Sequence, residues 1–206
     1  MFLYFFLMLY REFAYFFILL CLIANLHRMA EIWVRNKKFS LFLSENEISK
    51  GIKKIAENIK RDLEEKDPIL ICVLNGAFMF ASDLIKQLDF PCEVCFIRLK
   101  SYEGTKTGGK VKEIYGLIED IENRHVVILE DIIDTGHTMY ELMKNLGEKN
   151  PASLRIATLL FKPAALQLAV NPDYVAIEIP NSFIVGYGLD YEGHGRNLRD
   201  IYKICE

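Results

Sequence analysis

The sequence predicts an α/β fold, in which helices flank a mostly parallel β-sheet and a small hood or cap subdomain covers the edge of the sheet. Short runs of apolar residues alternate along the chain with segments of helical periodicity. The apolar runs are continuous, as in parallel strands that are buried on both faces. The tail after Pro180 lies outside this alternation, and we expect it to form the hood.

Length and composition bound the class of protein. A chain of 206 residues suits one domain of ordinary size, and a hydrophobic content of 51% suffices for a buried core. The net charge is −3, whereas nucleic-acid-binding surfaces usually need an excess of basic residues. We therefore expect no nucleic-acid partner.

Residues 1–28 form a hydrophobic N-terminal extension that differs from the rest of the chain. Arg11-Glu12 is the only charged pair in residues 1–26. A spanning helix needs about 20 apolar residues, but each charge near its centre costs about 2.5–3.5 kcal/mol on insertion scales. The stretch also lacks the positively charged start and small-residue cleavage site of a secretory signal.

Three interpretations of residues 1–28 stay open: a membrane anchor, a hydrophobic extension that packs on a partner, or an upstream over-call of the reading frame. We favour the last, with the true start at Met29, and expect membrane contact only if the extension is translated. The globular domain is residues 29–206. If the extension spans a membrane, the positive-inside rule keeps the domain in the cytoplasm, because four basic residues follow directly: Arg28, Arg35, Lys37 and Lys38. We predict a cytoplasmic location in either case.

The five cysteines do not predict a disulfide framework, because their number is odd and their spacing irregular. Cys92 and Cys95 form a C-x-x-C pattern within a β-prone run. Positions three apart on a strand point to opposite faces, and no second pair exists to complete a zinc site. We expect reduced, half-buried thiols.

The first half of the domain contains two helices and two strands. The pattern Ser44-x-x-Glu47 predicts a capping box that opens a helix reaching about residue 65. The other elements follow from apolar runs and helical spacing around a turn at Asn75-Gly76: a strand over 68–74, a helix over 77–88 and a strand over 92–99.

The second half begins with a polar, glycine-containing stretch over residues 101–112, which predicts a long mobile loop. Strands joined by right-handed crossovers then complete the sheet. The predicted elements are strands over 125–129, 153–161 and 174–179, a helix over 138–149 and a short helical piece over 163–169.

The segment VVILEDIIDTGHT, residues 126–138, carries the candidate chemistry. In open parallel sheets ligands bind outside the carboxyl ends of the strands, and we expect Glu130-Asp131 at such an end. Thr135-Gly136-His137-Thr138 opens the next helix, where free backbone N–H groups and the positive end of the helix dipole bind anions. This turn suits a phosphate.

The carboxylates of this segment need a different ligand group, because they would repel the phosphate. They suit hydroxyl donors, Mg²⁺ or a developing positive charge. Both features together predict a sugar phosphate, with Glu130 and Asp131 on ribose hydroxyls and the helix start on the 5′-phosphate. In the alternative, Asp134 caps the helix and the other two acids are solvated strand-end charges. The length and order of the pattern favour the ligand site.

This segment resembles the phosphoribosyl pyrophosphate (PRPP) signature of the type I phosphoribosyltransferases, and its E-D-I-I-D-T-G-x-T form is similar to that of the hypoxanthine(-guanine) phosphoribosyltransferases. The resemblance covers nearly all of residues 29–206. Other segments match the family's pyrophosphate loop, the start of its mobile catalytic loop, its base-binding segments and a late pyrophosphate-binding arginine: Leu74–Ala77, Ser101-Tyr102, Leu160–Lys162 with residues 179–191, and Arg196.

The resemblance implies a Mg²⁺-dependent enzyme of purine salvage. It would transfer the 5-phosphoribosyl group from PRPP to hypoxanthine and guanine, giving inosine or guanosine monophosphate and pyrophosphate. Its small-molecule partners would be PRPP and a 6-oxopurine. Relatives usually form homodimers or homotetramers, and we expect the same here.

The resemblance also assigns roles to residues. Asp134 would act as acid or base at the purine imidazole, and Tyr102 would belong to a loop that closes over the reacting centre and excludes water. The remaining assignments follow by group. Glu130, Asp131, Asp134, Thr135, Gly136, His137 and Thr138 would bind ribose phosphate; Asn75, Gly76, Ser101 and Arg196 pyrophosphate; Lys162, Phe183, Ile184 and Asp190 the purine; and Glu130, Asp131 and Asp190 the metal.

Two positions depart from the family pattern. Asn75 stands where lysine is common, so only backbone contacts to pyrophosphate, including a strained or cis Leu74-Asn75 peptide, are carried over. His137 stands where relatives often have lysine, which weakens the side-chain charge but leaves the backbone phosphate site intact.

Two other functions are weighed against purine salvage. The first is a xanthine-preferring relative, which the choice of base would distinguish. The second is a regulator that binds PRPP or nucleotides and acts on RNA or DNA. The net charge of −3, Lys162 and Phe183 argue against the regulator.

Overall fold

The computed structural model describes residues 31–101 and 111–205. The interpretations of residues 1–28 and the role of Tyr102 lie outside these residues. Within them, no helix is both long and apolar enough to cross a membrane.

The main sheet has six strands in the order β5-β4-β3-β6-β7-β8. All neighbours are parallel except the edge strand β5, which runs antiparallel to β4. The predicted mostly parallel sheet is therefore confirmed. Its strands are β3 (Ile69–Leu74), β4 (Glu93–Ser101), β5 (Val111–Tyr115), β6 (His125–Ile133), β7 (Ser153–Phe161) and β8 (Tyr174–Glu178).

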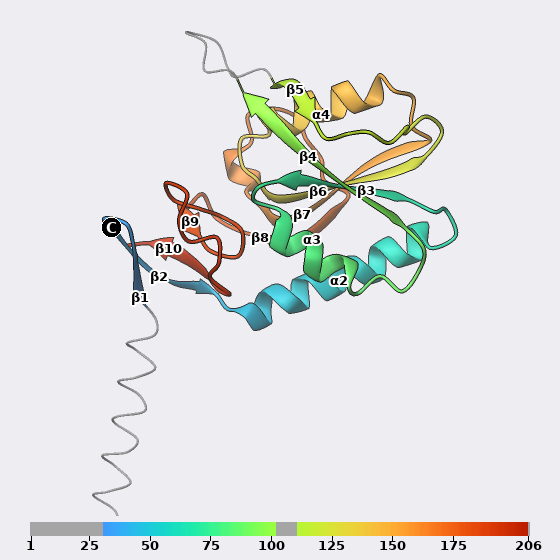
Figure 1. Ribbon diagram of the computed structural model, residues 1–206. Coiled ribbons are helices and arrows are strands. Elements are labelled where there is room, and N and C mark those ends of the chain that lie inside the picture. The colour runs from blue at the N-terminus through green and yellow to red at the C-terminus, as the bar shows by residue number, and fades with distance from the viewer. Residues whose placement is uncertain (1–30, 102–110, 206) are drawn as a thin grey trace, which may run out of the picture.

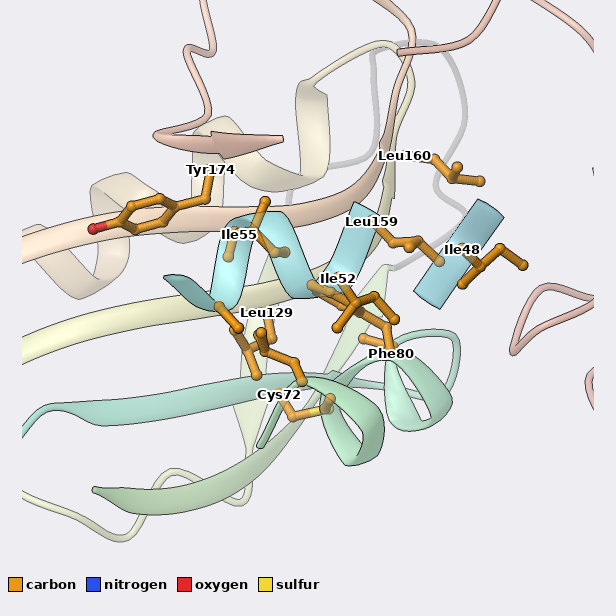
Figure 2. Close-up of a cluster of buried hydrophobic side chains, with 14 of the residues drawn as sticks. Ile48, Ile52, Ile55, Cys72, Phe80, Leu129, Leu159, Leu160 and Tyr174 are labelled. Carbon is orange, nitrogen blue, oxygen red and sulfur yellow. The ribbon is translucent and has the colours of Figure 1, made fainter. Parts of the chain in front are cut away.

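Helices cover both faces of this sheet, as Figure 1 shows. Helices α2 (Glu45–Leu63) and α3 (Phe78–Ile85) pack on one face, and α4 (His137–Gly147) packs on the other. Figure 2 shows part of the first core, where Ile52 and Ile55 of α2 meet side chains from β3, β6 and β7. Burial of such side chains on both faces explains why the strands are apolar throughout.

Strand β6 is longer than predicted, and this is a correction that bears on the site. It continues to Ile133 instead of ending at Leu129. Its pairing with β3 stops at Leu129↔Cys72, but β7 follows it as far as Ile133↔Phe161. Glu130 and Asp131 therefore lie within the strand, on the part that no longer has β3 as a neighbour.

Strands β3 and β6 meet at the topological switch point of the sheet. The chain goes from β3 to β4 toward one edge, and from β6 through β7 to β8 toward the other. The connections leave the two carboxyl ends in opposite directions and open a crevice between them, which is the usual ligand position in such sheets.

The hood is a second, four-stranded antiparallel sheet in the order β1-β2-β10-β9. The tail after Pro180 supplies β9 (Ile184–Val185) and β10 (Ile201–Ile204), as predicted. The other half, β1 (Glu31–Val34) and β2 (Lys37–Leu43), was not predicted. Because β9 and β10 are too short to form a stable sheet alone, they depend on β2 as a neighbour.

Two smaller predictions also need correction. Val111 and Lys112, assigned to the long loop, belong to the edge strand β5. The helical piece over 163–169 shrinks to a single 3₁₀ turn, η1 (Pro163–Ala165), because the backbone becomes extended at Leu166. The residues after that turn contact the segment before α4, as described below.

The two sulfurs of the C-x-x-C pattern lie on opposite faces of the sheet, as predicted, but only Cys92 is half-buried, whereas Cys95 is buried. Cys92 packs against the core that contains α2 and α3, whereas Cys95 packs in the core on the opposite face of the sheet. Cys72, Cys92, Cys95 and Cys205, the cysteines of the described residues, are free.

The predicted capping box is present at the start of α2. The Ser44 hydroxyl accepts a hydrogen bond from the Glu47 N–H, and the Glu47 carboxylate accepts one from the Ser44 N–H at 2.9 Å. These bonds satisfy donors that the helix itself cannot pair.

We predict that Ser44→Ala lowers the free energy of unfolding by about 1 kcal/mol, because one helix donor loses its acceptor. Urea unfolding followed by circular dichroism measures this loss. Ser49→Ala, in the same helix and outside the cap, is the control and should change stability less. An unchanged midpoint for Ser44→Ala would show that the box contributes no net stability.

Candidate active site

Three segments border the crevice at the switch point. The loop after β3 contributes Asn75 and Gly76, and the end of β6 with the start of α4 contributes residues 130–138. The hood contributes a loop over residues 186–196 that packs onto Gly76. These segments are far apart in the sequence and hold most of the residues predicted for ribose phosphate and pyrophosphate.

Asp131 is buried, and its neighbour Glu130 is half-buried with one carboxylate oxygen inside the protein. The Oε2 atom of Glu130 is buried and has no hydrogen-bond partner. Burial, together with the neighbouring Asp131, raises the pKa of Glu130 well above its usual range. Burial likewise raises the pKa of Asp131 to about 6, although Asp131 accepts a hydrogen bond from the Ile132 N–H at 2.9 Å. A buried acceptor without a donor is costly, so this geometry points to a ligand with hydroxyl groups or to a cation.

The start of α4 has the backbone geometry that an anion site needs. Gly136 is the N-cap residue, has a φ of 84°, and offers no side-chain cap. The first N–H groups of the helix therefore have no intrahelical acceptor and face outward as anion donors. A cavity of about 100 Å³ lies here, lined among others by Glu130, Asp134, Thr135 and Thr138. The alternative that Asp134 caps the helix is wrong.

The segment after η1 supports this helix start from behind. The Thr135 carbonyl accepts hydrogen bonds from the N–H groups of Gln167 and Leu168, at 3.0 and 3.4 Å. The His137 Nε2 atom lies 3.0 Å from the Gln167 Oε1 atom. A Cβ atom at position 136 would press on Leu166 and on the Leu168 carbonyl. Gln167 could not be predicted as a supporting residue, because its partners lie in a different segment of the sequence.

Lys162 is buried, with 5% of its surface exposed, and it is not the solvated charge that a lone lysine usually is. Its Nζ atom donates to the Asp134 Oδ2 atom at 2.7 Å. Its backbone N–H donates to the Ile133 carbonyl at 3.0 Å. The end of β7 is thereby joined to the end of β6, and a cation stands beside the segment before α4.

Glycines allow close backbone approaches on the β3 side of the crevice. The Leu74-Asn75 peptide is cis, in agreement with the sequence prediction. A Cβ atom on Gly76 would overlap the Asp131 carboxylate, and one on Gly188 would overlap the Gly76 carbonyl. Only glycine permits these approaches. Gly188 was not among the predicted site residues.

Arg196 and Asp190 lie together on the hood side. The Arg196 Nη1 atom donates to the Gly188 carbonyl at 2.6 Å, and its Nη2 atom lies 2.6 Å from the Asp190 carboxylate. Asp190 also accepts from the Gly193 N–H at 2.6 Å. The charge of Arg196 acts to lower the pKa of Asp131 against the effect of burial. The guanidinium and the buried carboxylates therefore share one electrostatic environment.

The predicted base-stacking residue Phe183 is 45% exposed, while Ile184 is buried in β9. The ring of Phe183 meets Tyr191 edge-on, with centroids 5.8 Å apart. The Nζ atom of Lys37 lies 4.6 Å from the Tyr191 ring centroid and 5.5 Å from that of Phe183. Lys37 was not predicted as a site residue, because the hood strand that carries it, β2, was not predicted.

The residues present fit a magnesium ion that is shared with phosphates. Among residues 31–101 and 111–205, no group of three or more His, Cys, Asp or Glu side chains is placed to hold a metal alone. Mg²⁺ in phosphate-transfer sites usually takes one or two carboxylates and completes its shell with water and phosphate oxygens. The unpaired Glu130 Oε2 atom beside Asp131 suits that role.

Of two further predicted site residues, the structure describes the backbone of Ser101 and does not describe Tyr102. Ser101 is the last residue of β4, so it lies at the carboxyl end of a strand that neighbours β3. Tyr102 lies outside the described residues.

We predict that Asp131→Asn stabilises the ligand-free, metal-free protein at pH 8 and not at pH 4. A carboxyl group with a raised pKa stabilises the fold fully only while it is protonated, and this contribution is lost as the pH rises through about 6. The difference from the ordinary value corresponds to at most about 3 kcal/mol. Urea unfolding at both pH values in chelator measures it; equal effects at the two pH values would contradict the prediction.

Comparison with known proteins supplies a family. The model of the phosphoribosyl transferase domain matches residues 42–192. The hypoxanthine-guanine-xanthine phosphoribosyltransferase of Tritrichomonas foetus is 42% identical over 156 residues, which are 75% of this chain and 85% of the relative. The hypoxanthine-guanine phosphoribosyltransferase of Aquifex aeolicus is 37% identical over 173 residues, which are 83% of this chain and 97% of the relative.

The same similarity holds in three dimensions. A structure of hypoxanthine phosphoribosyltransferase from Trypanosoma cruzi, a ternary complex with substrates, superposes with a TM-score of 0.73 at 35% identity. It covers 80% of this chain and 94% of the other.

Proposed function

This chain belongs to the phosphoribosyltransferase family, and we propose that it transfers the 5-phosphoribosyl group of PRPP to hypoxanthine and guanine. The products are inosine or guanosine monophosphate and pyrophosphate. The observation that carries the proposal is a buried carboxylate, Asp131, beside Glu130, which has a buried and unpaired oxygen; both precede a helix start that borders a cavity of about 100 Å³. A sugar phosphate offers hydroxyls to the carboxylates and a phosphate to the helix start.

In this proposal Glu130 and Asp131 accept hydrogen bonds from the ribose hydroxyls. Thr135, Gly136, His137 and Thr138 bind the 5′-phosphate, chiefly through backbone N–H groups at the start of α4. Positive charge develops on the ribose as the bond to pyrophosphate breaks, and the two carboxylates favour that charge. Their unfavourable burial in the free protein is then offset in the complex.

The leaving group, pyrophosphate, binds to residues on the β3 and hood side of the crevice. Asn75 and Gly76 offer backbone groups, Arg196 offers a guanidinium, and Ser101 stands at the end of β4. Mg²⁺, held by Glu130, Asp131 or Asp190 together with phosphate oxygens, would offset the charge of the departing pyrophosphate.

Residues at the end of β7 and in the hood bind the purine base. One imidazole nitrogen of the purine attacks the anomeric carbon, the carbon–oxygen bond breaks, and its electron pair leaves with pyrophosphate. The proton on the other imidazole nitrogen goes to the Asp134 carboxylate. Phe183 stacks on the purine, and Ile184 and Asp190 contribute backbone contacts.

Lys162 selects the base in this account. An ammonium group only donates hydrogen bonds, so it pairs with a 6-oxo group and leaves the 6-amino group of adenine unpaired. One of its three donors is engaged by Asp134 at 2.7 Å, and the others are available to the ligand. The same pair holds Asp134 in place to receive the proton.

The test uses the full chain with PRPP and Mg²⁺, supplied separately with hypoxanthine, guanine, xanthine and adenine, and follows nucleotide formation by absorbance. We expect turnover of 6-oxopurines and none of adenine. Xanthine is included because the Tritrichomonas foetus relative is named for it. Binding of PRPP without turnover of any base would overturn the enzyme assignment in favour of a PRPP-binding regulator.

We predict that Lys162→Ala lowers kcat/KM for hypoxanthine by about 10- to 100-fold, because both the 6-oxo group and Asp134 lose a charged donor. Lys162→Gln, which can also accept, should raise the ratio of adenine to hypoxanthine turnover. Lys60→Ala, an exposed lysine paired with Asp89, is the control. An unchanged rate and base preference in both Lys162 variants would remove this residue from the site.

Location and assembly stay predictions. A cytoplasmic enzyme is consistent with the free thiols of the described cysteines. A homodimer or homotetramer is expected from the family, and light scattering on the purified full chain would decide between them.

A further inference from the structure

Tyr187 holds an unusual position in the hood loop that touches the site. It lies between Gly186 and Gly188, and its own φ of 48° is in the left-handed region, as are those of the two glycines at 106° and 98°. A bulky residue adopts this conformation only where the surroundings enforce it. Tyr187 is 3% exposed, so packing and hydrogen bonding hold it there.

The hydroxyl of Tyr187 donates a short hydrogen bond to the carboxylate of Asp83. Burial raises the pKa of Tyr187, which keeps the hydroxyl protonated and makes it the donor. Asp83 lies on α3, the helix that begins directly after the loop of Asn75 and Gly76. The bond therefore ties the hood to the helix that carries the pyrophosphate loop.

The residue after Tyr187 touches that loop itself. Gly188 packs so closely on the Gly76 carbonyl that a Cβ atom would overlap it. Gly188 also exchanges hydrogen bonds with Arg196, from its N–H to the Arg196 carbonyl at 2.9 Å and from the guanidinium to its carbonyl at 2.6 Å. Any shift of Gly188 moves the Gly76 loop and Arg196 relative to each other.

We propose that the Tyr187–Asp83 hydrogen bond is a positioning device that sets the spacing between the Gly76 loop and Arg196, and so tunes affinity for the pyrophosphate group. Neither residue is among those assigned to the ligands. The inference rests on the proposed function, because it specifies how the pyrophosphate half of that site is held. It assigns a smaller effect to base binding, which uses Lys162, Phe183, Ile184 and Asp190.

The chain contains a matched control for a purely structural role. Tyr174 is also buried, at 4% exposed, and its hydroxyl donates to Asp62 of α2 at 3.0 Å. This pair lies at the amino end of β8, whereas the site borders the carboxyl ends of the strands. Tyr174→Phe removes the same kind of bond, together with one that the hydroxyl accepts from Arg155, without touching the hood.

Variants of Asp83 are expected to fold. Asp83 and Tyr187 line a cavity of about 520 Å³ between the start of α2 and α3, so a shortened side chain at position 83 leaves space that water can enter. Asp83→Ala removes the acceptor, and Asp83→Asn keeps an acceptor oxygen; both remove the ion pair of Asp83 with Lys86, one turn along the same helix. Tyr187→Phe removes only the hydroxyl. Melting temperatures of all variants establish that each is folded.

The experiment uses the full chain and measures KM for PRPP, KM for hypoxanthine and kcat, with calorimetric titration of inorganic pyrophosphate and Mg²⁺ as an activity-free readout. We expect Tyr187→Phe and Asp83→Ala each to raise KM for PRPP and the Kd of pyrophosphate by about tenfold. KM for hypoxanthine should change less than about twofold. Asp83→Asn should recover most of the loss, and the double variant should be no worse than either single one.

Two results would overturn the inference: pyrophosphate affinity within about twofold of wild type in Tyr187→Phe and Asp83→Ala, or an equal loss in Tyr174→Phe. Failure of the proposed function is a separate result. If the wild-type chain turns over no base, the calorimetric comparison of the same variants still decides whether this hydrogen bond positions the anion site.

Discussion

The removal of carboxylate oxygens of two neighbouring residues, Glu130 and Asp131, from water is the constraint on which the rest of the structure depends. Ionised groups are costly to bury without partners, and the raised pKa values of this pair express that cost. Such an arrangement persists only on a framework that is stable without it. The sheet supplies that framework, because apolar cores on both faces fix β6 between β3 and β7. The site lowers the free energy of unfolding, and the burial of apolar side chains in the cores raises it.

Close backbone approach around these carboxylates follows from the same constraint. A charge held away from water must be reached by ligands and donors over short distances. Gly76 lies against Asp131, Gly188 lies against Gly76, and Gly136 opens the helix start beside them. The hood loop can therefore bring Arg196 toward the carboxylates without a side chain in the way. The second sheet, which looks peripheral, is part of how the site is closed.

Local signals in the sequence predicted much of this arrangement. The apolar strands, the Ser44 capping box and the turn from Glu130 to Thr138 each depend on residues that are close in sequence. Local patterns therefore sufficed to predict them. The length of β6 was not, because it depends on pairing with β7 beyond Leu129. Strands β1 and β2 were missed for a similar reason, since β2 depends on β10, the last strand of the chain.

Contacts between residues of distant segments could not be predicted from the sequence either. Lys37 beside Tyr191, Gln167 beside His137, and Tyr187 bonded to Asp83 each join residues whose partners the sequence does not indicate. The resemblance to a family named the residues that would meet a ligand. It did not name the residues that hold those residues in place, which only the three-dimensional structure reveals.

The most direct measurement is the affinity of the full chain for inosine 5′-monophosphate against its 2′-deoxy counterpart, by calorimetry with Mg²⁺. If the buried carboxylates accept the ribose hydroxyls, the ribonucleotide binds at least about tenfold more tightly, because the deoxy ligand leaves a buried acceptor unpaired. Equal affinities for the two nucleotides would contradict the account, since the carboxylate pair would then have no part in recognising the sugar.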